Sequence, residues 1–262
     1  MKGMINMIIR EQNEHFTCIA QVDHAFLSGE MLKHLNTVYF EHAPYKDSVI
    51  YAAYQHDCGW DAFDRQPFWN DQKDLPYSFI DFPPIPKTVL YTHGIQQVQK
   101  KDSYAALLCS EHYKRFLVNS SLLEAKTFVQ QEAERQEWLI SKMGHFNQDR
   151  FEMDYTLLQF SDNLSLFVCM NEPGAADKDL HPFFKEGLSV SNTTAALPSD
   201  YSISWTDTKT VTMDPFPFSS DFSITLPYKS ISKKSIQQQG IIDAYEHAPV
   251  LSQTIWIKSR NE

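Results

Sequence analysis

The sequence lacks any run of about 18 consecutive apolar residues, so it offers no segment that would cross a membrane as a helix. Residues 1–10 are too few and too interrupted by polar side chains to form a secretory signal peptide. The four cysteines lie far apart without a C-x-x-C pair, which argues against a zinc ribbon or a disulfide framework. These absences predict a cytoplasmic protein whose cysteines are small buried side chains.

Basic residues are scarce, because 23 Lys and Arg stand against 33 Asp and Glu and give a net charge of -10. Residues 181–262 carry 7 basic and 8 acidic side chains, so nearly all of the excess lies before them. An acidic surface repels nucleic acid and anionic membranes, and the sequence has no basic stripe interleaved with aromatic residues. We expect a small-molecule substrate, no nucleic acid and no membrane as partners, and leave a homodimer open.

The character of the chain changes near residue 175. Before it, apolar residues recur mostly with a helical period; after it, Pro, Ser and Thr rise and short β-branched or aromatic runs appear at 201–205, 210–213, 222–226 and 254–258. We predict a mainly α protein. Residues 1–174 form a helical metal-binding domain with a short strand at 4–10, and residues 175–262 form a β-rich C-terminal appendage on the same core. This antiparallel appendage is placed to pair with the N-terminal strand.

One short motif, His56-Asp57, stands at the end of a helical run. Val49, Ala53 and His56 are spaced i, i+4, i+7, so the histidine projects from an apolar face. Burying such groups without a partner costs several kcal/mol. A metal ion would satisfy a neutral imidazole and a carboxylate together, whereas the ordinary alternative is a helix-end histidine beside a capping aspartate.

Further polar residues fall on apolar stripes of other predicted helices. His24 shares a stripe with Leu27 and Met31, in a helix that Asp23 is placed to cap. An isolated histidine of this kind is usually a core residue bonded to a carbonyl. His112 lies on the buried stripe of a helix at 104–116, with Asp102 as its N-cap.

Two more members complete this set. His93 shares a broad face with Val89 and Leu90, close to Gly94. Asp162 stands in the middle of a helix at 154–170 that is apolar almost all round, where its charge is costly to bury and its helix propensity is poor. We interpret Asp162 as a metal ligand in preference to a buried hydrogen-bonding residue.

Residues 60–86 are dense in aromatics and prolines and show no periodicity. Seven aromatic side chains argue against disorder in this stretch. It is expected to form a lid or pocket wall, or else an irregular segment that only packs on the core.

The order of these residues resembles the ligand pattern H…HD…H…H…D of the HD-domain superfamily. The resemblance covers roughly residues 20–170, and the whole chain is most similar to an uncharacterised bacterial family of HD-like proteins. It implies an all-α, HD-domain-like helical bundle with bound metal. In such a bundle four residues hold one ion and two more hold a second ion, and Asp57 bridges the two ions. The implied ligands are His24, His56, Asp57 and Asp162 for the first ion, and His93 and His112 for the second.

Imidazoles and carboxylates without thiolate suit one or two borderline divalent ions, such as iron, manganese, zinc, cobalt or nickel. Such ions turn a bound water into hydroxide near neutral pH. Our leading hypothesis is a metal-dependent hydrolase of HD type that acts on a small phosphorylated metabolite or nucleotide. HD phosphohydrolases often have a Lys or His a few residues after the pair, whereas this chain has Cys58-Gly59-Trp60-Asp61. A replacement cation would be Arg65, Lys114 or Arg115, of which Arg115 lies nearest the face of His112.

Two other functions stay open. The resemblance also implies a mixed-valent di-iron oxygenase, which Trp60 and the aromatic segment favour because they indicate a pocket less directed at phosphate. A non-catalytic binding or sensor protein stabilised by its metal is the third. On the leading hypothesis, Asp57, Trp60 and Arg115 are the predicted catalytic residues.

Overall fold

The computed structural model describes residues 7–190 and 197–260. Helices dominate the first part of the chain and strands the last part. The helices are α1 (Gln21–His34), α2 (Lys46–Gln55), α3 (Pro84–Gln99), α4 (Ser103–Leu117), α5 (Leu123–Lys142), α6 (Gln148–Met170) and α7 (Lys233–His247). The strands are β1 (Ile8–Glu11), β2 (His15–Ile19), β3 (Trp69–Asn70), β4 (Leu75–Pro76), β5 (Leu188–Ser189), β6 (Asp200–Asp207), β7 (Thr210–Asp214), β8 (Phe222–Ser232) and β9 (Val250–Ser259). Short 3-10 turns lie at Thr37–Phe40, Cys58–Trp60, Asp177–Asp179 and Pro182–Phe184.

A seven-stranded sheet joins the two ends of the chain in the order β1-β2-β8-β9-β7-β6-β5. Its neighbours are antiparallel except β7 and β9, which run parallel. The prediction of a mainly α, HD-like bundle with a small β appendage, and the all-α class that went with it, is therefore wrong. The four predicted runs are strands, but β2 was not foreseen, and β8 continues past Leu226 to pair with it. Of the strand predicted at 4–10, residues 4–6 lie outside the described residues.

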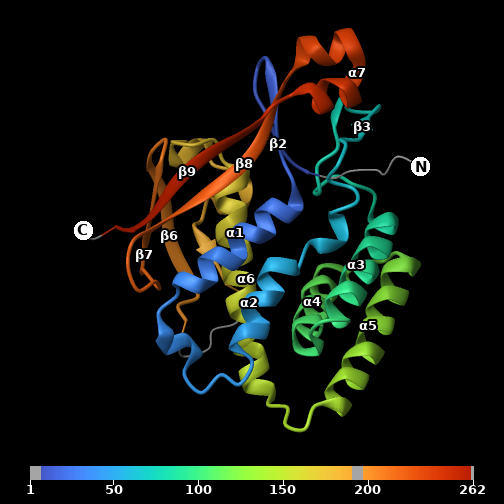
Figure 1. Ribbon diagram of the computed structural model, residues 1–262, viewed down its shortest axis with the longest axis vertical. Coiled ribbons are helices and arrows are strands. Elements are labelled where there is room, and N and C mark those ends of the chain that lie inside the picture. Colours follow the sequence, from blue (N-terminus) through green and yellow to red (C-terminus); the bar gives the residue numbers. More distant parts are fainter. Residues whose placement is uncertain (1–6, 191–196, 261–262) are drawn as a thin grey trace.

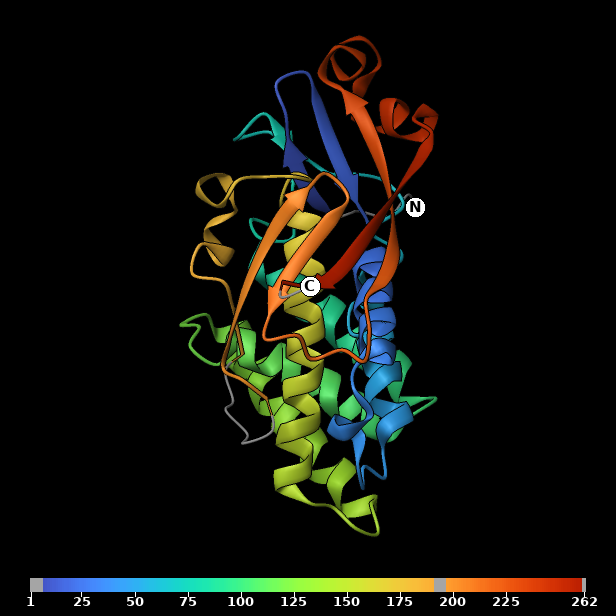
Figure 2. The same cartoon turned by 90° about the vertical axis from the view of Figure 1, so that its left-hand side faces the viewer.

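The curved sheet covers one side of α1 and α6 (Figures 1 and 2), with β8 packed on α1 and β1 and β5 on α6. Helices α3, α4 and α5 lie on the side of α1, α2 and α6 that faces away from the sheet (Figure 1). One continuous apolar core runs through both layers. Helices α1 and α6 are thus central, and this explains why α6 is apolar almost all round.

The local signals for helix ends were partly correct. Asp102 caps α4, because its side chain accepts a hydrogen bond from the Ala105 backbone N–H at 2.9 Å. Asp23 does not cap α1, which begins two residues earlier at Gln21. Helix α3 begins at Pro84, where a missing backbone N–H costs nothing because the first turn has no acceptor for it. Helix α2 ends at Gln55 with His56 as its C-cap residue.

Gly59 allows the turn after α2 to lie directly against α3. A Cβ atom at Gly59 would stand 2.3 Å from the Leu90 carbonyl oxygen, and one at Gly94 would stand 2.9 Å from the Gly59 nitrogen. No larger residue fits at Gly59 without moving backbone. This contact fixes the segment that carries His56 and Asp57.

Within residues 7–190 and 197–260, no helix combines the length and the apolar composition needed to cross a lipid bilayer. The division of the chain at residue 175 stays a prediction.

Candidate metal centre

Five of the predicted ligands lie together in the interior, on four separate helical segments. His24 comes from α1, His56 and Asp57 from the end of α2, His112 from α4 and Asp162 from α6. Each is buried, with between 1% and 7% of its surface exposed. The helical stripes that predicted these positions therefore do converge.

The imidazoles surround the two carboxylates at close range. His24 Nε2 lies 3.2 Å from His56 Nε2 and 3.2 Å from Asp162 Oδ1, and His56 Nε2 lies 3.4 Å from the same oxygen. Asp57 Oδ2 is 3.4 Å from His24 Nε2 and 3.7 Å from His56 Nε2. His112 Nε2 approaches the other Asp162 oxygen, Oδ2, at 3.6 Å.

Hydrogen bonds at the far side of two rings fix which nitrogen carries the proton. His56 Nδ1 lies 2.8 Å from the Ala53 carbonyl oxygen, which only accepts, so Nδ1 is the donor. The Ser165 hydroxyl donates to the Asp162 carbonyl at 2.9 Å, so its oxygen is free to accept from His24 Nδ1 at 2.6 Å. With Nδ1 as the donor in both rings, Nε2 is the nitrogen that each ring directs to the same point, and in the neutral ring it carries the lone pair that would bind an ion.

Two lone pairs 3.2 Å apart repel unless a cation lies between them. A proton serves this purpose at one ring, and a metal ion would serve it at both. His24, His56 and Asp162 each offer one ligand atom, and these atoms all lie within 4.8 Å of one another. This buried group could hold a metal ion.

The pKa values in the cluster reflect the same electrostatics. Burial alone would lower the pKa of His24, but hydrogen bonds and charge from Asp162 and Asp57 outweigh it and raise that pKa to about 9. Burial would raise the pKa of Asp162, yet the imidazoles of His24 and His56 hold it well below its ordinary value. Burial lowers the pKa of His112 to about 4. Without a metal, the cluster holds ionised aspartates, a protonated His24 and a neutral His112 near neutral pH.

Asp57 has its own support. The Tyr113 hydroxyl donates to Asp57 Oδ1 at 2.9 Å and also lies against the His56 carbonyl oxygen. The carboxylate is thereby held with Oδ2 toward the histidines. His112 Nδ1 is buried and has no hydrogen-bond partner among the described residues, so this ring is the least constrained of the three.

A small cavity of about 40 Å³ adjoins the cluster, with His24, Asp57, His112 and Asp162 in its wall. Trp60 lines it as predicted, edge-on to the rings of Phe82 and Tyr91. The rest of the wall is mostly aromatic. Besides Trp60, its apolar or aromatic members are Phe79, Tyr91, Tyr113, Phe116 and Leu166. Residues 60–86 thus contribute a pocket wall, through Trp60 and Phe79.

Arg115 is not free to receive an anion. Its Nε donates to Glu111 at 2.7 Å, and a terminal nitrogen donates to Glu152 at 2.8 Å. Its guanidinium also lies 4.1 Å from the centre of the Tyr155 ring. The predicted replacement cation therefore belongs to a structural network, and none of the described residues lining the cavity is Lys or Arg.

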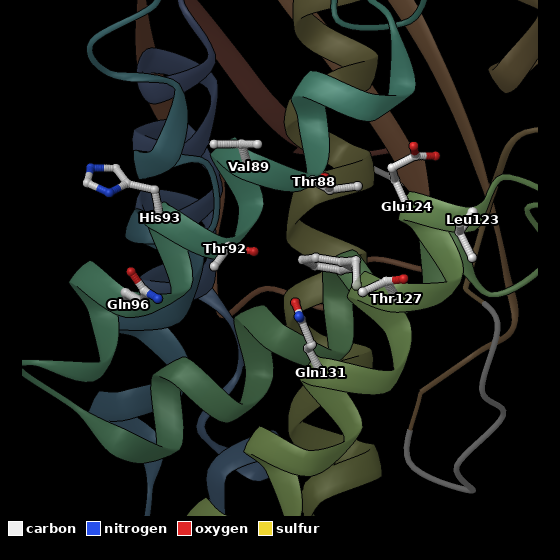
Figure 3. Close-up of a pocket in the computed structure, with 10 residues that line it drawn as sticks. Thr88, Val89, Thr92, His93, Gln96, Leu123, Glu124, Thr127 and Gln131 are labelled. Atoms are coloured by element: carbon white, nitrogen blue, oxygen red, sulfur yellow. The ribbon is translucent and has the colours of Figure 1, made fainter.

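His93 does not join the cluster. Tyr91, two residues earlier on α3, faces the site and stacks on Tyr113 with ring centres 3.9 Å apart. Residues two positions apart in a helix are rotated by about 200° from each other, so His93 points away from the site and is exposed. It lies instead on a groove of about 550 Å³ between α3 and α5 (Figure 3). The sequence interpretation took Val89 and Leu90 as one buried face, but only Leu90 is buried and Val89 is 66% exposed.

Three residues of the site were missed. Ser165 lies one turn after Asp162 on α6, Tyr113 follows His112 directly, and Gln21 lies one turn before His24 on the stripe already identified. Helical spacing from the predicted ligands would have found Ser165 and Gln21. No sequence pattern indicates that Tyr113 reaches Asp57.

Comparison with known proteins replaces the resemblance drawn from the sequence. No curated protein matches the chain, and no solved structure matches it. Residues 7–233 match a family described as a protein of unknown function, DUF3891. The HD-domain identification is wrong, because this match is to a different family and the fold contains a large curved sheet. The chain belongs to the DUF3891 family.

Proposed function

We propose that this chain is a metal-dependent hydrolase that acts on a small molecule. The observation that carries the proposal is the meeting of His24 Nε2, His56 Nε2 and Asp162 Oδ1, with both histidine tautomers fixed from behind. Preset ligand orientation of this kind is typical of functional metal sites. Because the donors are nitrogen and oxygen only, they suit borderline divalent ions such as zinc, iron, manganese, cobalt or nickel.

The residues divide into two groups. His24, His56 and Asp162 would hold the ion, which would polarise a substrate oxygen and lower the pKa of a nearby water. Asp57, ionised and oriented by Tyr113, is placed to accept a proton from a water in the cavity. His112 is neutral near neutral pH and adjoins the same space, so it is placed to pass that proton on or to bind the ion as a further ligand.

The phosphorylated substrate expected from the sequence has no support in the cavity wall. Arg115, the cation assigned to phosphate, is bound by Glu111 and Glu152. We therefore propose hydrolysis without assigning phosphate as the group attacked.

Metal content and turnover test the proposal together. Purified protein should contain close to one equivalent of a transition metal by elemental analysis, and a chelator should abolish hydrolysis of a substrate found by screening esters, amides and phosphoesters. Asp162→Asn should lose both metal and turnover, because it removes the carboxylate shared by the imidazoles. His93→Asn, a histidine change outside the cluster, should lose neither. A metal-free preparation with full activity would sink the proposal.

A second function is favoured by the donor set itself. Two histidines and one carboxylate are the ligands that non-haem iron oxygenases use, and the aromatic cavity suits an apolar substrate. The dinuclear form expected from the sequence would require His93, which lies on another face of α3. Iron as the native metal, together with oxygen uptake by the loaded protein, would decide for oxygenation. Metal that raises thermal stability without any turnover would instead indicate the non-catalytic protein.

A further inference from the structure

Gln21 is a buried polar residue in the cavity wall that the cluster does not use. It is 2% exposed, and its Oε1 has no hydrogen-bond partner within residues 7–190 and 197–260. It lines the same cavity as His24, Asp57 and Asp162. A buried amide oxygen without a donor is unfavourable, so its position beside the cluster indicates that a bound molecule supplies the donor.

The position of Gln21 is set in advance. It is the first residue of α1, whose N-cap residue Ala20 offers no side-chain hydrogen bond. Asp64, which lies 42 residues after Val22, takes over that role, because its Oδ2 accepts the Val22 backbone N–H at 3.2 Å. Asp64 is buried and ties the start of α1 to the segment that follows the His56-Asp57 pair. Gln21 and the cluster are therefore held in one frame.

The charge around the cavity limits what can bind. A divalent ion at the cluster would balance the charges of Asp57 and Asp162 and leave the site neutral. An anion would then bring uncompensated charge into a buried space walled by aromatic rings such as Trp60 and Phe79. Arg115, the cation that the sequence assigns to this site, already binds two carboxylates. An uncharged ligand meets no such cost.

We propose that Gln21 is a substrate-positioning residue and that the substrate is a small uncharged carboxamide. This rests on the proposed hydrolase function and names its substrate class. A hydrolysable, uncharged group that also offers an N–H to Gln21 Oε1 is a carboxamide, since an ester has no such donor. In the reaction, the oxygen of water bonds to the carbonyl carbon and the C–N bond breaks. One water proton goes to the leaving nitrogen, giving a carboxylic acid and an amine.

Acetamide is the probe for this proposal, titrated into the Co²⁺-loaded full-length protein and followed by the visible absorption of the ion. Gln21→Leu, which keeps the size of the side chain and removes its amide, should raise the Kd of acetamide at least tenfold. N,N-dimethylacetamide has no N–H, so it should bind the wild type and the variant equally. Inorganic phosphate at the same concentration should change neither spectrum.

Two results would overturn the proposal. The first is an acetamide Kd that is the same in the wild type and in Gln21→Leu. The second is tighter binding of phosphate than of acetamide. The acetamide and dimethylacetamide comparison on wild type alone gives a second readout that needs no variant. A merely structural role for Gln21 predicts a lower Tm in Gln21→Leu, whereas our proposal predicts an unchanged Tm and an unchanged Co²⁺ affinity. Failure of the wild type to bind Co²⁺ would sink the metal-dependent function itself, whereas retained Co²⁺ with acetamide indifferent to Gln21 would remove only the carboxamide proposal.

Discussion

Ser165 gives the sharpest test of the metal centre, because it acts on a ligand without being one. Its oxygen lies 2.6 Å from His24 Nδ1, and its hydroxyl donates to the Asp162 carbonyl at 2.9 Å. It therefore joins two of the three proposed ligands. Ser165→Ala would leave the His24 N–H without an acceptor in a buried site and would free the ring to change tautomer.

The size of the effect follows from this geometry. Loss of a residue that orients a metal-bound histidine lowers metal affinity by about 10- to 100-fold, which corresponds to about 1.4–2.7 kcal/mol. The unsatisfied N–H also lowers the free energy of unfolding of the metal-free protein by about 1–3 kcal/mol. Calorimetric titration with Zn²⁺ measures the first quantity, and urea denaturation in the presence of a chelator measures the second.

Ser161→Ala is the matched control. Ser161 is equally buried and lies one turn earlier on α6, where its hydroxyl bonds Ser28 at 2.8 Å and the Leu158 carbonyl at 2.9 Å. Its removal should lower stability by a similar amount and leave Zn²⁺ affinity unchanged. Equal Zn²⁺ affinities in the two variants would refute the claim that Ser165 orients His24 for a metal.

Three further predictions follow from the site. Metal binding should release the proton of His24, whose pKa in the folded protein is about 9. The apparent Zn²⁺ affinity should therefore rise about tenfold per pH unit between pH 7 and pH 9 and then level off, which Zn²⁺ titrations at several pH values will measure. An affinity that does not change with pH would contradict the raised pKa of His24. Gly59→Ala should lower the free energy of unfolding by about 1–3 kcal/mol in urea denaturation, because its Cβ would meet the Leu90 carbonyl oxygen at 2.3 Å; unchanged stability would mean that the two backbones separate freely. His112→Ala should lower metal affinity if this ring is a ligand, and equilibrium dialysis should detect it, whereas His93→Ala should have no effect in the same assay.

The positions of most cluster residues were predictable because a buried polar residue on an apolar helical stripe is costly and needs a reason. That argument found His24, His112 and Asp162 from local spacing alone. It failed for His93 because it assumed which face of α3 was buried. The role predicted for Arg115 from its spacing to His112 was wrong because its second carboxylate partner, Glu152, lies 37 residues further on another helix.

The extent of the sheet was underestimated because its prediction used local sequence patterns alone. Strand β2 is short, and the strand it pairs with is remote, since residues 15–18 lie opposite residues 229–232. Four consecutive residues of β2 are buried, so the strand has no alternation of buried and exposed side chains that a local pattern would reveal. Pro227 stands inside β8, where a residue without a backbone N–H discourages the prediction of a continuous strand. Local pattern therefore identified the strands at 201–205, 210–213, 222–226 and 254–258 and their pairing with the N-terminal part of the chain, but not β2, which lies between β1 and β8.

Only Ala20 separates β2 from α1. Because this linker is one residue long, the β2–β8 ladder fixes the position of the helix that carries Gln21 and His24. A slip of this pairing by one residue would reverse the faces of β2 and rotate the start of α1 with it. The register of the C-terminal strand β8 on β2 therefore sets how α1 presents Gln21 and His24 to the cluster.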